Sequence, residues 1–579
     1  MDVAVQHPTV RCKRLAARDS VRQAGETGRG GRGGCGFLGA SSGLFDGFLE
    51  QRLTHGDVSL ARGRAVECRL AKQALKERGR WYLEPVPGTV LWGLALLAVL
   101  AVAAAVRWEL LATRSLWYDE GYSLFVARMG GRQILQFLKA NDAHPAGYYV
   151  LLSFWIQRFG EGLLVARLPS FVFGVAAVAL TWLVASRLHG PASAAVAALL
   201  VAIHPFQVMA SNELRMYSLL TVLVLAAVLA AVRAIRGGDS WALLLGVLWA
   251  AVGYTSYYGL LAVVGMAAAL WTGGHRKVAG LAAATGLALY LPWLPYLAGF
   301  WRANPQLWTR ETLWWGYPVE LLAAQAFGGY WPDTFTYHTS FRGSVFLYVP
   351  LLVPYGLFAA ATVALAGRER SEGLRLVRWT WMTAFVAILG LSLAMGWAAA
   401  YPRHLTFLQP LAACWVAVGL VELSRALRLR SRAAGLGVLW LLSLQGPALV
   451  AMQSDPRYQS YRYDLAARFV QSAFRAGDAV VYVPGGTSLA FEYYFRPPGP
   501  RVEVRIQPRP YRPEEWRPRF DRGLRALVGQ VQRVWTVTTA PAPPAAEAAL
   551  KEALGARGYR VVGERAFPGL KVSLAVRAR

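Results

Sequence analysis

Two adjacent carboxylates follow the first long apolar stretch of the chain, in the segment SLWYDEGYSLFVAR at residues 115–128. Ionised groups beside hydrocarbon are costly, so Asp119 and Glu120 require water, a partner or a chemical role there. A carboxylate in such a position can accept the proton of a hydroxyl group, and it can also stabilise the N-terminus of a helix. The spacing alone supports Asp119 as a helix N-cap, with Glu120 in the first turn, as well as it supports catalysis.

Further ionisable residues stand at the ends of other apolar stretches. Glu213 begins one such stretch, with Arg215 beside it and Tyr217 one helical turn further on. Arg403 precedes another, and a guanidinium group can hold a phosphate through paired hydrogen bonds. The pair Glu213 and Arg215 can also be a solvated helix end, and Arg403 an interfacial anchor. The charged and titratable side chains that we expect on one face are Asp119, Glu120, Asp142, His144, Glu213, Arg403 and His404.

The elements that must position these groups are membrane-spanning helices. Only 16% of the 579 residues are charged, against roughly 25% in soluble proteins. Apolar stretches of about 20 residues, long enough to cross a bilayer as helices, recur along the chain. We therefore predict a polytopic α-helical membrane protein. The eleven expected spans cover residues 87–106, 164–186, 191–209, 213–233, 240–256, 258–272, 278–300, 344–366, 376–397, 404–424 and 434–452.

The loops between these spans alternate in character. One set is basic, as in RALRLRSR at 425–432, and basic loops stay in the cytoplasm. The other set is aromatic and acidic and includes the long loops 107–163 and 301–343, which we expect on the outer face of the inner (plasma) membrane. The N-terminus is then cytoplasmic and the C-terminus extracytoplasmic. The net charge of +28 arises largely from the N-terminal region and the basic loops, so we predict no nucleic acid partner.

Three regions are expected along the chain. Residues 1–80 are rich in Arg and Gly and are predicted to be a basic, disordered extension. Residues 81–455 contain the spans, with two interfacial helices, at 120–140 and 144–160, that wall a cavity above the bilayer. Residues 456–579 change period and predict a small extracytoplasmic α/β domain. Its helices are expected at 463–478 and 544–558, and its strands at 479–484, 502–507, 533–539 and 571–577.

The distribution of charge separates two classes of membrane function. A transporter needs polar or charged groups near the bilayer midplane, whereas the expected spans contain almost no ionisable residues. The charged groups stand instead at the outer ends of spans, at the level of lipid headgroups and their phosphates. This favours an enzyme that acts on a lipid-borne substrate. His144, which precedes Pro145, and His404 fit such a site, and they also fit purely structural roles at helix ends.

Five short stretches occur in an order and a topological placement that resemble a known family: LWYDEGYS, HPAGYYVLLSFWIQRFGEGLLVARLPS, NELRMYSLLTVL, YTSYYGLL and YPRHLTFLQP. Over roughly residues 85–455 the chain resembles glycosyltransferase family 39-like proteins. These are membrane glycosyltransferases of the GT-C type, related to protein O-mannosyltransferases and to the lipid A aminoarabinose transferase.

The resemblance implies inverting transfer of a monosaccharide from a polyprenyl-phosphate donor to a lipid, glycan or protein acceptor on the extracytoplasmic face. It assigns the catalytic centre to Asp119, Glu120 and Glu213, and we take Asp119 as the base, with Glu120 either orienting it or holding a metal. Some relatives bind a divalent metal near these carboxylates, so a metal held by Asp119 and Glu213 is left open. Donor phosphate and substrate binding are assigned to Arg403, Arg215, His144, His404, Tyr217 and Tyr258.

Two alternatives stay open at this point. A flippase for lipid-linked sugars would move its substrate without forming a new glycosidic bond. An oligosaccharide transferase with a diphosphate carrier would transfer a whole chain in place of one sugar. For acceptor choice we expect the Trp- and Tyr-rich loop 301–343, although an interfacial aromatic belt explains the same composition.

Overall fold

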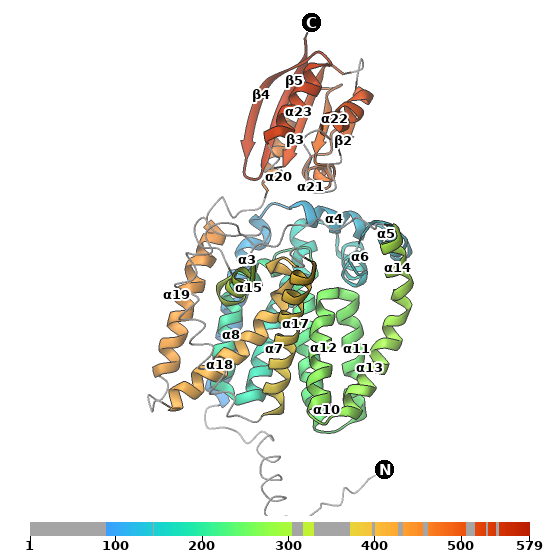
Figure 1. Cartoon of the computed structure of the whole chain (residues 1–579). Helices are drawn as coiled ribbons and strands as arrows, with labels where there is room; N and C mark the ends of the chain where they lie inside the picture. The colour runs from blue at the N-terminus through green and yellow to red at the C-terminus, as the bar shows by residue number, and fades with distance from the viewer. Residues whose placement is uncertain are drawn as a thin grey trace, which may run out of the picture. The chain divides into compact units, whose positions relative to one another are not determined.

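A computed structural model describes residues 89–142, 144–303, 317–328, 371–395, 400–426, 432–454, 461–504, 516–527, 531–539 and 544–578. All of them belong to one compact unit, Gly88–Arg579. Within this unit the short outer helices of residues 118–159 come between the first long helix and the rest of the helix bundle, and a mixed α/β layer follows the bundle near the C-terminus (Figure 1).

The long helices contain the membrane-spanning segments. Their bounds are α3 Thr89–Thr113, α7 Leu163–His189, α8 Pro191–Ile203, α9 Pro205–Ser211, α10 Tyr217–Ile235, α11 Asp239–Thr255, α12 Tyr257–Thr272, α13 Arg276–Tyr290, α14 Leu294–Ala303, α15 Tyr317–Phe327, α17 Glu372–Met395, α18 Gln409–Ala426 and α19 Arg432–Ser454. In the described part of the chain, six continuous helical segments are long and apolar enough to cross a membrane. The number is seven if the bent pair α8 and α9 counts as one span. The chain is thus a polytopic helical membrane protein.

The expected number of eleven spans is not reached in the described part of the chain. Helices occupy the expected ranges except 344–366, which lies outside the described residues. The count differs for two further reasons. The helices α11 and α12 have only 17 and 16 residues, fewer than the roughly 20 that typically cross a bilayer. The helix α19, at the expected span 434–452, is not among the helices long and apolar enough to cross.

The break between α8 and α9 lies deep in the protein and bends the chain by 64°. It exposes the last carbonyl groups of α8, because Pro205 cannot continue the hydrogen bonding of the helix. Arg107, a fully buried residue of α3, donates to the carbonyl oxygens of Val201 at 3.3 Å and Ala202 at 2.6 Å, and to Ser211 Oγ at 3.0 Å. Arg107 therefore fixes the turn that leads to Glu213. It is a charged side chain inside a membrane-spanning helix, where the sequence predicted almost no ionisable residues.

The loop between α3 and α7 forms three helices, α4 Tyr118–Ala127, α5 Gly131–Asn141 and α6 Gly147–Phe159. The expected single helix at 120–140 is wrong, because the chain breaks between α4 and α5 at Gly130, whose extended backbone (φ −66°, ψ 158°) makes it the N-cap of α5. The expected second helix, at 144–160, corresponds to α6. These helices form the layer above the bundle in the view of Figure 1.

The C-terminal part is an α/β domain with a five-stranded sheet of order β2-β1-β3-β5-β4. Its elements are α20 Tyr463–Ala473, β1 Ala479–Val483, α21 Thr487–Tyr494, β2 Arg501–Glu503, α22 Trp516–Leu524, β3 Arg533–Thr539, α23 Pro544–Gly555, β4 Tyr559–Phe567 and β5 Leu570–Arg577. β1 pairs parallel with β2 and β3, and β5 pairs antiparallel with β3 and β4. The apolar run of β1 is buried throughout because strands flank it on both sides.

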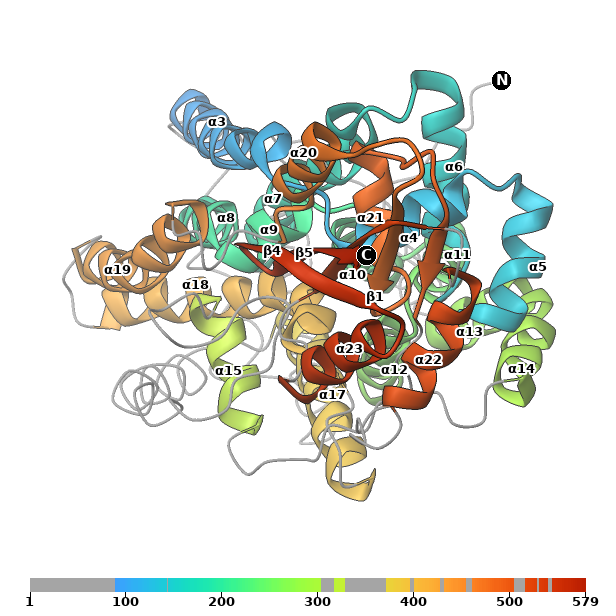
Figure 2. The same ribbon diagram turned by 90° about the horizontal axis from the view of Figure 1, so that it is seen from above.

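The α/β domain packs on the outer helices through α21, which lies beside α4 in both views (Figures 1 and 2). The contact is so close that a Cβ atom at Gly121 would lie 2.8 Å from backbone atoms of Leu489 and Ala490. The backbone nitrogen of Leu116 also donates to the Tyr494 hydroxyl at 2.7 Å. The segment that carries Asp119 is thus held between the bundle and the α/β domain.

We predict that Gly121→Ala destabilises the protein by about 1–3 kcal/mol, because the added methyl group forces the backbones of α4 and α21 apart. A lowered midpoint of thermal unfolding of the purified protein would show the effect. Gly131→Ala is the matched control, since an added Cβ there has no heavy atom of the structure within 4 Å. If both variants unfold at the wild-type temperature, the close packing of α4 on α21 is not a source of stability.

Candidate active site

Asp119 is the accessible carboxylate of the acidic group. It lies in the first turn of α4, behind the N-cap Trp117, so it is not the N-cap that the spacing allowed. Its side chain is 22% exposed, and Oδ2 lies 4.0 Å from Nε of Arg215. The side chains of Glu120 and Glu213, in contrast, are fully buried. Of the three predicted acidic residues, only Asp119 has a side chain that solvent reaches.

Glu120 forms a buried ion pair with Arg167 of α7. The two side chains make a paired contact, with Nε to Oε1 at 2.8 Å and Nη2 to Oε2 at 2.7 Å. The same carboxylate accepts hydrogen bonds from the backbone nitrogens of Trp117, at 3.2 Å, and Leu214, at 3.1 Å. Glu120 therefore joins α4, α7 and the turn before α10, and it performs the capping that the spacing suggested for Asp119.

Arg167 also completes the end of α3. Its Nη1 donates to the carbonyl oxygens of Leu111, at 3.1 Å, and Arg114, at 2.8 Å, and its Nη2 to that of Ser115 at 3.3 Å. These carbonyls lack partners within α3 because they lie at its C-terminus. One side chain thus ties the end of α3 to the start of α4.

Glu213 is held in the turn between α9 and α10 by a second buried arginine. Nη2 of Arg114 donates to Oε1 of Glu213 at 3.0 Å, and both side chains are almost inaccessible. A buried charge needs such a partner. Glu213 therefore lies at the site, as expected, with its carboxylate directed at Arg114.

Arg215 connects Asp119 to a polar chain on α6 and the segment before it. Its Nη2 lies 3.0 Å from Nε2 of His144, and its Nη1 donates to the Tyr149 hydroxyl at 3.3 Å. The Tyr149 hydroxyl in turn donates to Asp142 at 2.9 Å. A guanidinium group only donates, so Nε2 of His144 accepts and its Nδ1 carries the hydrogen directed at Asp142, 2.7 Å away. His144 is therefore neutral in this arrangement.

Asp142 stays ionised at the end of this chain. Burial by itself would raise its pKa, but the hydrogen bonds from the ring and the backbone nitrogen of His144 and the charge of Arg215 hold the pKa below its ordinary value. A permanent negative charge there keeps Arg215 and His144 in place.

Arg403 and His404 approach the same site from the short 3-10 helix η2, Pro402–Leu408. The Arg403 guanidinium lies 5.7 Å from the ring centre of Trp117 and 4.8 Å from that of Tyr401. It is close enough to Asp119 and Glu213 to be attracted by both. Stacking on aromatic faces holds a guanidinium group flat.

His404 stands in an aromatic stack. Its ring centre lies 4.6 Å from that of Tyr258 and 6.2 Å from that of Tyr217, with planes tilted by 21° and 29°. Its Nδ1 accepts a hydrogen bond from the backbone nitrogen of Tyr401 at 3.2 Å. The imidazole therefore helps to orient η2 beside the site.

The structure brings together the nine residues that the sequence assigned to the site, and it adds four. Missing from the sequence interpretation were Arg114, Arg167, Trp117 and Tyr149. Arg167 could have been identified from the sequence, because a lone arginine four residues after the start of an apolar helix needs a buried partner. The identity of that partner depends on tertiary structure.

The donor set does not fit a divalent metal. Glu120 and Glu213 are occupied by arginine side chains, and Asp119 is flanked by Arg215, so positive charge already stands where a metal would lie. In the described part of the chain, no three His, Cys, Asp or Glu side chains gather in a way that could hold a metal ion. We derive no step through a metal.

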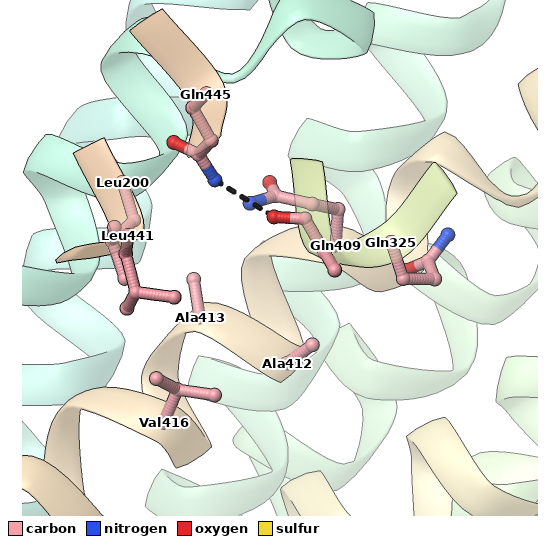
Figure 3. Close-up of a pocket in the computed structure, with 9 residues that line it drawn as sticks. Leu200, Gln325, Gln409, Ala412, Ala413, Val416, Leu441 and Gln445 are labelled. Carbon is pink, nitrogen blue, oxygen red and sulfur yellow. Dashed lines mark hydrogen bonds between the residues drawn. The ribbon is translucent and has the colours of Figure 1, made fainter. Parts of the chain in front are cut away.

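A small cavity lies between α8, α15, α18 and α19, and Gln325, Gln409 and Gln445 stand on its wall (Figure 3). Gln325 donates to the carbonyl of Leu405 at 3.0 Å and Gln445 to that of Ala326 at 3.1 Å. The cavity volume is about 10 Å³, which is room for a single water molecule and not for a sugar. Gln325 therefore ties α15 to η2 and Gln445 ties α19 to α15, and the cavity is no substrate site.

The comparisons with known proteins fit this geometry. Residues 143–296 match the sequence model of the family described as dolichyl-phosphate-mannose-protein mannosyltransferase. ArnT from Cupriavidus metallidurans has a similar fold in its apo form and bound to undecaprenyl phosphate, each with a TM-score of 0.50 and 14% identity over 83% of this chain and 97% of that chain. A further solved structure, the Archaeoglobus fulgidus oligosaccharyltransferase tethered with an acceptor peptide, has a TM-score of 0.47 and 14% identity over 77% of this chain and 69% of its own.

A search of curated proteins gives no match. The family match includes His144, Glu213, Arg215, Tyr217 and Tyr258 and ends before Arg403. Together with the fold, it confirms the resemblance to membrane glycosyltransferases of the GT-C type that the sequence motifs indicated.

Proposed function

We propose that the protein transfers one sugar from a polyprenyl-phosphate donor to a lipid, glycan or protein acceptor, with inversion, on the extracytoplasmic face. The observation that carries the proposal is one accessible carboxylate, Asp119, 4.0 Å from the Arg215 guanidinium, with the Arg403 side chain stacked on Trp117, the residue that precedes α4. In support, these groups stand on the outer helices and at the ends of apolar helices, the level at which a lipid phosphate lies.

Asp119 is the base in this reaction. Its carboxylate takes the proton of the acceptor hydroxyl as that oxygen attacks the anomeric carbon of the donor sugar. The bond between the anomeric carbon and the phosphate oxygen breaks on the opposite face, and its electron pair leaves with the lipid phosphate. A single displacement of this kind inverts the anomeric centre, and general-base catalysis contributes roughly 10²–10⁴-fold to the rate.

Two arginine side chains of the site can interact with an anionic leaving group. Within each of the pairs Glu120–Arg167 and Glu213–Arg114 the two charges neutralise one another. Asp119 and Asp142 balance the charges of Arg215 and Arg403, so the site is close to neutral before the donor binds. The guanidinium groups of Arg215 and Arg403 can then stabilise the additional negative charge that develops as the lipid phosphate departs.

Replacement of Arg403 tests the assignment of the phosphate site. With purified protein and radiolabelled polyprenyl-phosphate mannose, we expect Arg403→Ala to raise the donor KM by about 10-fold or more, because a hydrogen bond to a charged group is worth about 1.5–3 kcal/mol. Arg403→Lys should recover only part of the loss, since an ammonium group cannot form the paired contact.

Arg158→Ala serves as the control, because Arg158 is an exposed side chain of α6. A normal donor KM in both Arg403 variants would place the phosphate elsewhere. If the wild-type protein consumes neither polyprenyl-phosphate mannose nor donors that carry other sugars, the proposed function itself is contradicted.

A further inference from the structure

The backbone that carries Arg403 is held from both sides by side chains of other helices. Arg403 stands in the short 3-10 helix η2, and 3-10 turns have poorer hydrogen-bond geometry than α-helices. The direction in which the Arg403 guanidinium points therefore depends on the contacts between η2 and the helices that pack on it. Those contacts come from α9 and α15.

Tyr317, the first residue of α15, holds the chain three residues before Arg403. Its hydroxyl group donates to the carbonyl oxygen of Ala400 at 2.7 Å and accepts from the backbone nitrogen of Ala400 at 3.3 Å. Both residues are buried, where an unpaired backbone group is costly. One tyrosine hydroxyl thus satisfies both backbone groups of Ala400 and fixes the start of η2.

Two buried glutamines hold the other side of η2. Nε2 of Gln325, near the end of α15, donates to the carbonyl oxygen of Leu405 at 3.0 Å. Nε2 of Gln207 in α9 donates to that of Thr406 at 2.7 Å. Both glutamines are at most 5% exposed, so solvent does not compete for these bonds. The backbone is therefore fixed after Arg403 as well as before it.

The helix α15 is suited to hold η2 in one place. Its buried face follows helical spacing and consists of Tyr317, Leu321, Ala324 and Gln325. The end of the helix is also fixed, because a Cβ atom at Gly328 would lie 2.9 Å from side-chain atoms of Pro205 at the break between α8 and α9. Two of the three bonds that hold η2 thus come from a helix that is itself anchored to the bundle.

We propose that α15 positions Arg403 for the donor phosphate, with Tyr317 and Gln325 as the positioning residues. They act through the backbone of η2 and not by contact with the donor. The inference rests on the proposed transfer reaction and adds the residues that orient its phosphate-binding group. α15 lies in the loop 301–343, for which the sequence predicted a role in acceptor choice, so the inference gives this loop a role toward the donor.

Lipid binding without sugar transfer tests the inference. The probes are undecaprenyl phosphate and undecaprenol, which differ only in the phosphate group, and their dissociation constants are measured with the purified full-length protein by native mass spectrometry. We expect the wild type to prefer the phosphate. Tyr317→Phe should weaken the binding of undecaprenyl phosphate by about three- to fivefold, the effect of one hydrogen bond. The binding of undecaprenol should stay unchanged.

A double-mutant cycle shows whether Tyr317 acts through Arg403. In the Arg403→Ala background, Tyr317→Phe should cause no further loss of undecaprenyl phosphate binding, because the group that it positions is absent. Equal losses in the two backgrounds would contradict the proposal. Gln325→Leu removes the second bond between α15 and η2, and the same selective loss is expected. It decides the test if Tyr317→Phe is not recovered as folded protein.

Tyr559→Phe is the matched control, since the hydroxyl group of this buried tyrosine donates to the carbonyl oxygen of Val531 at 2.7 Å within the α/β domain. We expect its lipid binding to equal that of the wild type. An unchanged preference for the phosphate in folded Tyr317→Phe and Gln325→Leu, or an equal loss for both lipids, would contradict the positioning role and leave the transferase intact. Equal binding of both lipids by the wild type would contradict the phosphate site and with it the proposed function.

Discussion

Asp119→Asn is expected to lower the rate of sugar transfer by about 10²–10⁴-fold while the protein stays folded. The amide keeps the size of the side chain and its place on α4, but it cannot accept the proton of the acceptor hydroxyl. Because the closest ion pair of Asp119 in the described part of the chain is a long one, 4.0 Å to Arg215, its neutralisation costs little stability. The measurement is kcat with saturating polyprenyl-phosphate sugar, together with the midpoint of thermal unfolding.

Glu109→Gln provides the control for this variant. Glu109 is an exposed carboxylate near the end of α3, so its removal changes the local charge equally without touching the site. We expect its kcat to equal that of the wild type. Full activity in a folded Asp119→Asn variant would show that another group takes the proton.

Glu120→Gln is expected to have the largest effect on stability, about 3–5 kcal/mol, because it leaves Arg167 as a buried charge without its counterion. The loss should appear as a strongly lowered midpoint of thermal unfolding and as poor recovery of folded protein. The double variant Glu120→Leu with Arg167→Met should regain much of this stability, since it removes both buried charges together.

The double variant also separates stability from positioning. Arg167 ties α3 to α4 through three carbonyl groups as well as through Glu120. We therefore expect the rescued double variant to fold and still show a reduced kcat with an unchanged donor KM, because α4 no longer holds Asp119 in one place. A double variant less stable than Glu120→Gln would contradict the account of Glu120 as a counterion.

The site residues could be predicted from sequence because charge is rare in this chain and therefore conspicuous. Asp119, Glu213 and Arg403 each stand at the end of an apolar stretch, and hydropathy alone brings such ends to one face. Which of these carboxylates is accessible and which is paired with a buried arginine could not be predicted. Whether a carboxylate meets solvent or an arginine depends on side chains distant in sequence, such as Arg167, 47 positions after Glu120.

The fold shows the same limit. The apolar period placed the helices near their observed bounds, and strands β1, β3 and β5 lie where strands were expected, because each is largely buried. β4 was missed because its side chains are mostly exposed, so its sequence YRVVGERAF lacks a sustained alternation. Acceptor choice was assigned to the loop 301–343, which lies outside the described residues except for 301–303 and 317–328.

The most direct test of the central claim is the mass and anomeric configuration of the product that the purified protein forms from polyprenyl-phosphate mannose and an oligosaccharide, peptide or lipid acceptor. A donor that carries another sugar is used if mannose is not accepted. We predict an acceptor heavier by one sugar, with a new linkage opposite in configuration to the donor. Movement of the lipid across the bilayer with no new bond, transfer of a whole chain, or retention of configuration would each contradict the account.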